Sequence, residues 1–69
     1  MNWTHVSSSH ISSIAYDDKS ASLYVRFHDG ATYIYYDVPV FIYDGLLSAA
    51  SHGSYLASRV KGVFRYKRL

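Results

Sequence analysis

The sequence predicts an α+β domain, in which an antiparallel sheet has helices packed on one of its faces. The first observation is an alternation of apolar and polar residues around an Asp-Gly pair, which is typical of a β-hairpin. The second is a proline that opens an apolar stretch with helical spacing. The third is a second stretch in which residue types alternate with a period of two, residues 63–69 after the last glycine. Together they predict the element order β-β-β-α-α-β.

Length and composition favour one folded domain. The chain has 69 residues, of which 49% are hydrophobic and 17% are aromatic. A domain of this size buries only about 60% of the surface that its unfolded chain exposes, so its apolar residues must pack efficiently. Cysteine is absent, which excludes disulfides and thiolate metal sites.

The first ten residues are polar and include a run of serines. We interpret residues 1–10 as an N-terminal arm anchored by Trp3 and Val6, and residues 11–69 as the domain proper. The N-terminus lacks the basic and apolar segments of a secretory signal, and no stretch approaches the ~20 apolar residues of a membrane span. We therefore expect a soluble, cytoplasmic protein.

Three strands are expected before the helices. In the second of them, Leu23, Val25 and Phe27 alternate with polar or aromatic neighbours. Asp29-Gly30 then predicts a two-residue hairpin loop, because these residue types tolerate the positive φ that a type I′ turn needs. The expected strands are residues 11–16, 21–27 and 31–36.

A two-residue loop would fix the register of this hairpin, and opposed residues share a face of the sheet. Val25 would then lie opposite Ile34. The outer set of side chains mixes rings with a cation, which a plain core does not need, so it is a candidate binding surface. The expected core face carries Leu23, Val25, Phe27, Ile34 and Tyr36. The expected outer face carries Tyr24, Arg26, His28, Tyr33 and Tyr35.

Two helices and a last strand complete the predicted domain. Pro39 suits the start of a helix that runs to about Ala50 with an apolar stripe. Gly45 within this helix indicates either close packing or a weak helix. Ser51 suits the N-cap of a shorter second helix that stops at Gly62. Residues 63–69 alternate as the last strand.

Four stretches resemble the KTSC domain, a family named after a C-terminal domain of lysyl-tRNA synthetase. They are SSSHISSIAYD, LYVRFHDGATYIYYDVP, LLSAASHGSYL and VKGVFRYKRL. They contain a serine-rich start, a central Tyr-x-Tyr, a Val-Pro step into a helix, a Ser-x-Gly step, and a late glycine followed by aromatic and basic residues. The resemblance covers the chain from about Val6 onward. The helix departs from it, because VFIYDG replaces glutamates that relatives commonly carry, which hints either at a partner surface or at a core that is packed differently.

The resemblance implies a small accessory domain and no defined activity. Such domains occur alone in bacteria and their viruses and fused to tRNA synthetases, and RNA binding has been suggested for them. We therefore expect a small bacterial or phage protein that binds a partner and is not an enzyme.

The placement of charge favours an anionic partner. The formal net charge is +2, but five of the seven lysines and arginines lie in the last eleven residues, after all five aspartates. Sheet tyrosines could stack bases while these cations hold phosphates. RNA or another single-stranded nucleic acid is therefore expected to bind Tyr24, Arg26, Tyr33, Tyr35, Arg59, Lys61, Arg65, Lys67 and Arg68.

The same residues admit other roles. The tyrosines could form a protein interface or a homodimer contact, or they could pack beneath a helix. The basic residues could simply solvate an exposed strand edge. The alternative function is a protein-interaction module, such as a viral or prophage adaptor or inhibitor, that also uses the apolar helix around Phe41, Ile42 and Tyr43.

No catalytic, metal or cofactor site is expected. The four histidines show none of the local spacings of metal ligands. Ser7–Ser9 beside His10 lie in a polar arm, where adjacency in sequence gives no catalytic geometry. The glycines are scattered and form no phosphate-binding loop.

Overall fold

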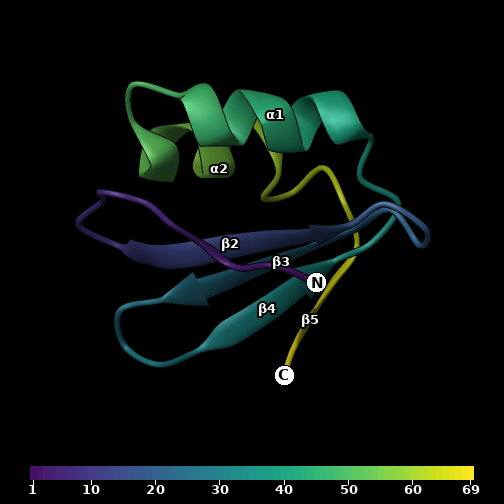
Figure 1. The fold of residues 1–69 in the computed structure, drawn as a ribbon, viewed down its shortest axis with the longest axis horizontal. Coiled ribbons are helices and arrows are strands. Elements are labelled where there is room, and N and C mark those ends of the chain that lie inside the picture. Colours follow the sequence, from purple (N-terminus) through teal and green to yellow (C-terminus); the bar gives the residue numbers. More distant parts are fainter.

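The computed structural model describes residues 1–69 as a five-stranded antiparallel sheet with two helices over one face (Figure 1). The strands lie side by side in chain order, and both helices intervene before the last strand. The predicted α+β class, with helices on one face, is confirmed. The strands are β1 Thr4–His5, β2 Ile11–Asp17, β3 Ser22–Phe27, β4 Thr32–Tyr35 and β5 Tyr66–Arg68. The helices are α1 Val40–Ser48 and α2 His52–Arg59.

The N-terminal arm adds an edge strand, β1, that was not among the predicted strands. This strand pairs with the middle of β2. Two residues are too few to show an alternating pattern, so the pairing has no sequence signal. Both expected anchors are half-buried: Val6 packs against the core, and the Trp3 ring lies edge-on to Tyr24 with centroids 6.2 Å apart.

The β3–β4 hairpin is one residue out of the predicted register. Its loop holds three residues, His28–Gly30, where two were expected. Val25 therefore lies opposite Tyr33, and the expected pairing of Val25 with Ile34 is wrong.

The chemistry of the loop explains the shift. The Phe27 N–H donates to the Ala31 carbonyl at 2.9 Å, and the Gly30 N–H donates to the Phe27 carbonyl at 3.0 Å. Gly30 has a φ of 92°, the left-handed conformation that closes three-residue hairpin loops. The Asp29 carboxylate accepts from the Ala31 N–H at 2.9 Å and holds the turn. An Asp-Gly pair serves this turn as well as the shorter one.

The one-residue shift places each β4 side chain on the face of the sheet opposite to the predicted one. Tyr33 and Tyr35 belong to the side packed under the helices, whereas Ile34 is buried outside the main core cluster. Tyr24 and Arg26 remain on the other side of the sheet. The predicted grouping of Tyr24, Arg26, Tyr33 and Tyr35 on one outer face is therefore wrong.

The hydrophobic core lies between the sheet and the helices. It draws on β2, β3 and β4 from the sheet, on α1 and α2, and on Val38 at the entry to α1. The chain as a whole is compact, with principal extents of 28 × 24 × 23 Å. The core residues are Ile11, Ile14, Leu23, Val25, Tyr35, Val38, Ile42, Leu46, Leu56 and Val60.

Local signals set the helix ends as expected, within a few residues. Pro39 occupies the N-cap position of α1, and the helix ends at Ser48, two residues before the predicted end. Ser51 caps α2 by accepting from the Ser54 N–H at 3.2 Å. Beyond α2, Gly62 has a φ of 77° and turns the chain toward β5.

Gly45 marks a close approach between the two helices. A Cβ at this position would overlap the Tyr55 ring and hydroxyl of α2. Of the two readings of this glycine, close packing is correct. The close packing of α1 against α2 therefore requires a residue without a side chain at position 45.

We predict that Gly45→Ala destabilises the domain by up to about 2 kcal/mol, because overpacking of the α1–α2 contact by the added methyl costs about 1–3 kcal/mol. The helical preference of alanine, about 1 kcal/mol, offsets only part of this cost. The measurement is urea-induced unfolding. Gly53→Ala in α2 is the matched control, since nothing lies within 4 Å of its added Cβ. Equal stability of the two variants would contradict the prediction.

Candidate nucleic-acid interface

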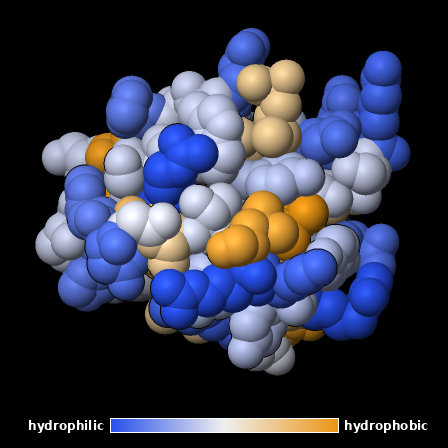
Figure 2. All heavy atoms as spheres, turned by 90° about the horizontal axis from the view of Figure 1, so that it is seen from below, coloured by the Kyte–Doolittle hydropathy of each residue, from blue (hydrophilic) through white to orange (hydrophobic).

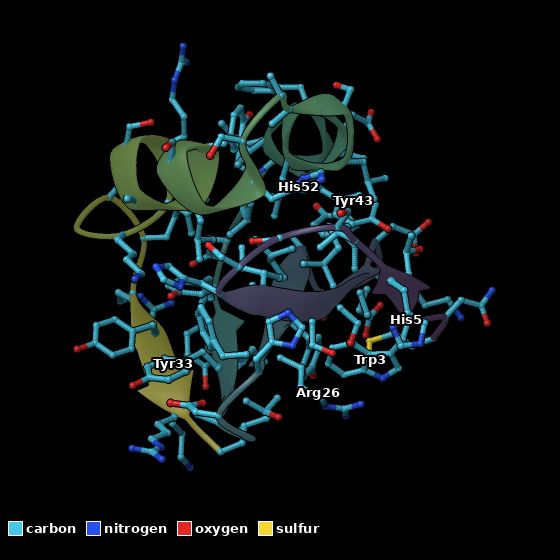
Figure 3. All side chains as sticks on the ribbon, turned by 90° about the vertical axis from the view of Figure 1, so that its left-hand side faces the viewer. Trp3, His5, Arg26, Tyr33, Tyr43 and His52 are labelled. Carbon is cyan, nitrogen blue, oxygen red and sulfur yellow. The ribbon has the colours of Figure 1, made fainter.

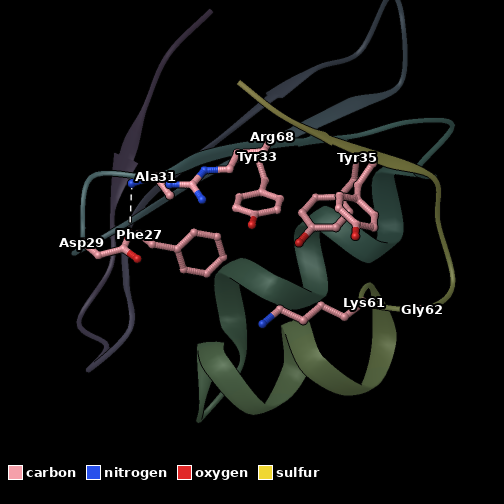
Figure 4. A pocket seen from close by; sticks show the side chains of 9 residues that line it. Phe27, Asp29, Ala31, Tyr33, Tyr35, Lys61, Gly62 and Arg68 are labelled. Atoms are coloured by element: carbon pink, nitrogen blue, oxygen red, sulfur yellow. Dashed lines mark hydrogen bonds between the residues drawn. The ribbon is translucent and has the colours of Figure 1, made fainter.

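A groove opens on the helix-facing side of the sheet, where β4, β5 and the segment after α2 meet (Figure 4). Its volume is about 560 Å³. One wall comes from the sheet and the β3–β4 loop, and the other comes from the end of α2. The groove is lined by Phe27, Asp29, Ala31, Tyr33, Tyr35, Lys61, Gly62, Tyr66 and Arg68.

Three rings form what we call the tyrosine triad: Tyr33, Tyr35 and Tyr66. Their centroids are 5.8 Å apart for Tyr33–Tyr66, 6.0 Å for Tyr35–Tyr66 and 6.4 Å for Tyr33–Tyr35. Antiparallel pairing of β5 with β4 places Tyr66 opposite Tyr35 and so closes the triad. Phe27 packs edge-on against Tyr33 at 5.6 Å. The aromatic wall is therefore continuous along the groove.

Cations border this aromatic wall. The Lys61 ammonium lies 5.6 Å from the Phe27 ring centroid, within the range of a cation–π contact. Arg68 pairs in register with Tyr33 and lines the groove. Asp29 is the one acid of the lining, and its carboxylate already holds the Ala31 N–H. The groove thus combines flat apolar surface with two cations and one carboxylate.

Tyr35 lies at the base of the triad and is only 2% exposed. Burial raises the pKa of its hydroxyl above the ordinary value of 10.0, and the neighbouring Tyr33 and Tyr66 hydroxyls add to the shift. Its hydroxyl makes no hydrogen bond within the protein, yet it is not sealed from solvent. It is a neutral polar group facing the groove.

The structure brings together four of the nine residues expected to bind nucleic acid. Tyr33, Tyr35, Lys61 and Arg68 all line the groove. They come from two strands and from the end of a helix, so no single stretch of sequence displays the set. The groove also contains Phe27, Asp29 and Tyr66, which were not predicted to bind nucleic acid. The alternation of residues 63–69 was the available sequence signal for Tyr66, but it does not specify the strand beside which β5 lies.

Tyr24 and Arg26 lie across the sheet from the groove and contact the arm. The Arg26 guanidinium stacks over the Trp3 ring, 4.2 Å from its centroid. Figure 3 shows Trp3 and Arg26 together and apart from Tyr33, which lies beside β5. The opposite face, seen in Figure 2, is mostly hydrophilic around a small apolar patch.

The remaining cations are dispersed. Arg65 forms an ion pair with Asp37 at 2.9 Å, between two exposed side chains, which contributes little to stability. Arg59 lies beside Tyr55 on α2, 5.9 Å from the ring centroid. Lys67 pairs in register with Ile34 and so projects to the face away from the groove.

A second hollow, of about 490 Å³, lies between the serine-rich arm and the start of α2. Ser8 Oγ accepts from the His10 and Ile11 N–H groups, and Nδ1 of His52 hydrogen-bonds to the Leu46 carbonyl. These serine and histidine side chains therefore bond to backbone and form no nucleophile–base pair. No cluster of three or more histidine or carboxylate side chains is arranged to hold a metal ion. Neither helix has the length and apolarity needed to span a bilayer.

The sequence profile of the KTSC domain matches residues 7–64. The chain belongs to the KTSC domain family. Its fold agrees with the crystal structure of a KTSC domain protein from Yersinia pestis, with a TM-score of 0.92 and 35% sequence identity over 99% of this chain and 96% of that one.

Two relatives place this KTSC domain in different contexts. A protein of Tsukamurella paurometabola is 45% identical over 60 residues, which cover 87% of this chain and 90% of that protein. A lysine–tRNA ligase of Trichormus variabilis is 33% identical over 61 residues, which cover 88% of this chain but only 11% of the ligase. The domain therefore exists both as most of a small protein and as a small part of an enzyme that acts on tRNA.

We predict that the domain loses stability above pH ~10 and that Tyr35→Phe reduces this loss. The unfolded tyrosine releases its proton near the ordinary pKa of 10.0, whereas the buried Tyr35 retains it, so rising pH favours unfolding. Burial, together with Asp18, Asp17 and Asp44, also raises the pKa of Tyr16. The measurement is the free energy of unfolding in urea between about pH 8 and 11. Tyr16→Phe combined with Tyr35→Phe should give the flattest profile, and parallel profiles for all proteins would contradict the prediction.

Proposed function

We propose that this KTSC domain is an accessory domain that binds single-stranded RNA in the groove. The observation that carries the proposal is the tyrosine triad, bordered by Lys61 and Arg68. Aromatic rings stack on unpaired bases, and flanking cations hold the backbone phosphates. The proposed role is binding without catalysis, in the cytoplasm.

The openness of Tyr66 supports access by a strand. Its side chain is 62% exposed, although its ring stands 5.8 Å from Tyr33 and 6.0 Å from Tyr35. A base can therefore stack on Tyr66 and on the half-buried Tyr33 without displacing the core, to which Tyr35 belongs. The relationship to part of a lysine–tRNA ligase agrees with an RNA partner.

The proposal predicts that Tyr66→Ala weakens binding of a short single-stranded RNA by about 5- to 150-fold, the range expected for loss of one base-stacking contact. Because Tyr66 is exposed, the substitution leaves the core in place. The measurement is fluorescence anisotropy with a labelled mixed-sequence oligonucleotide in low salt. Absence of binding by the wild-type domain under these conditions would refute the proposal.

Charge reversal tests which face the RNA contacts. Arg68→Glu should weaken binding and reduce the slope of log affinity against log salt by about 0.7, the value for one phosphate contact to a single strand. Arg26→Glu changes the net charge equally but lies on the opposite face, so it should leave the affinity nearly unchanged. The reverse result would assign binding to the outer face.

A second candidate function is protein interaction through α1. Val40 and Phe41 are 54% and 67% exposed at the start of this helix, which is unusual for large apolar side chains. Of the predicted surface, only Phe41 is free, because Ile42 is in the core and Tyr43 stacks on Tyr16 at 5.0 Å. If the patch forms a homodimer, sedimentation will show a dimer that Phe41→Ser converts to monomer, with RNA affinity unchanged.

A further inference from the structure

We propose that the groove recognises guanine: an unpaired guanine base of the bound strand stacks on the aromatic wall, with Asp29 and Lys61 reading its polar edge. This inference rests on the proposed function and names the base for which the groove is built. It follows from three polar groups of the groove that keep hydrogen-bonding capacity free for a ligand: the second Asp29 oxygen, the Lys61 ammonium and the Tyr35 hydroxyl.

Asp29 supplies a fixed hydrogen-bond acceptor. One carboxylate oxygen accepts from the Ala31 N–H at 2.9 Å, which holds the side chain at the end of the groove (Figure 4). The other oxygen has no donor within the protein, and Asp29 forms no ion pair, because the single ion pair of the domain joins Arg65 and Asp37. A carboxylate so placed is ready to accept from a ligand N–H.

Lys61 supplies a donor from the facing wall. Its ammonium lies over the Phe27 ring and is not neutralised by any carboxylate of the domain. Lys61 and Asp29 line the same groove, and Figure 4 shows the Phe27 ring between their side chains. A flat ligand in the groove can therefore meet a donor from one wall and an acceptor from the other. The opposite charges remain separate and available to a ligand.

The Tyr35 hydroxyl is a polar group at the base of the groove. The side chain is 2% exposed, its hydroxyl is unpaired within the protein, and the hydroxyl oxygen is still reached from the groove. A hydroxyl can donate or accept, so it suits a polar ring atom of a base. An entirely apolar ligand would leave this hydroxyl without a partner.

Guanine fits this set better than the other bases. It offers two adjacent donors, N1–H and the N2 amino group, to a carboxylate, and two acceptors, O6 and N7, to a lysine or arginine. Uracil has a single N–H donor, and adenine and cytosine have one amino group each. Only guanine can therefore give two hydrogen bonds to Asp29 while its O6 or N7 accepts from Lys61.

The test compares pentaribonucleotides that differ only in the central base. The probes are UUGUU, UUIUU with inosine, UUAUU, UUCUU and UUUUU, each labelled at the 5′ end and measured by fluorescence anisotropy in low salt. Wild-type protein should bind UUGUU about tenfold more tightly than the A, C and U strands. It should also prefer guanine over inosine by several-fold, because inosine lacks only the N2 amino group.

Asp29→Asn tests the acceptor directly. The asparagine oxygen can still accept from the Ala31 N–H, so the loop is retained, but the second acceptor becomes a donor. This variant should bind UUGUU and UUIUU equally. Asp18→Asn, which removes an exposed aspartate from the β2–β3 turn, is the matched control and should keep the preference.

The outcomes separate the two proposals. If the wild-type domain binds all five strands with equal affinity, guanine recognition is overturned and RNA binding stands. If Asp29→Asn keeps the preference for guanine over inosine, the assigned role of Asp29 is overturned. If no strand binds in low salt, the proposed function fails and the inference fails with it. The inosine comparison on the wild-type protein alone also decides the question independently of any variant.

Discussion

The pairing of Phe27 with Ala31 across the β3–β4 loop is the constraint on which the rest of the structure depends. The Phe27 N–H donates to the Ala31 carbonyl at 2.9 Å, and Gly30 provides the left-handed residue that closes the loop. This pairing fixes the register of β4, and the side-chain period of a strand is two. It therefore determines that Tyr33 and Tyr35 face the helices while Ile34 faces away.

The groove is a consequence of that register and of the chain's return after the helices. Once Tyr33 and Tyr35 face the helices, the pairing of β5 with β4 adds Tyr66 and Arg68 on the same side. The end of α2 then places Lys61 over Phe27. The helices do not cover this corner of the sheet, so the exposed Tyr66 ring and the half-buried Tyr33 ring remain open to a ligand, whereas Tyr35 joins the core.

Both faces of the sheet carry aromatic and basic residues, but these residues make different contacts on each face. On the face away from the helices, Arg26 stacks on Trp3 at 4.2 Å and Trp3 packs against Tyr24, so these groups partner one another. In the groove, the Tyr35 hydroxyl makes no hydrogen bond within the protein, and the Lys61 ammonium, although it lies over the Phe27 ring, has no ion-pair partner. The free hydrogen-bonding groups, more than the number of rings, distinguish the groove as the candidate site.

The sequence by itself determined the α+β class, the helix caps at Pro39 and Ser51, the hairpin between β3 and β4 and the family, because these features depend on patterns within short stretches. Only the tertiary structure decided which tyrosines meet. An Asp-Gly pair suits loops of two or three residues. A difference of one loop residue shifts the register of the following strand by one and moves each of its side chains to the other face of the sheet. The return of β5 beside β4, which brings Tyr66 to Tyr35, is a long-range contact that no local pattern specifies.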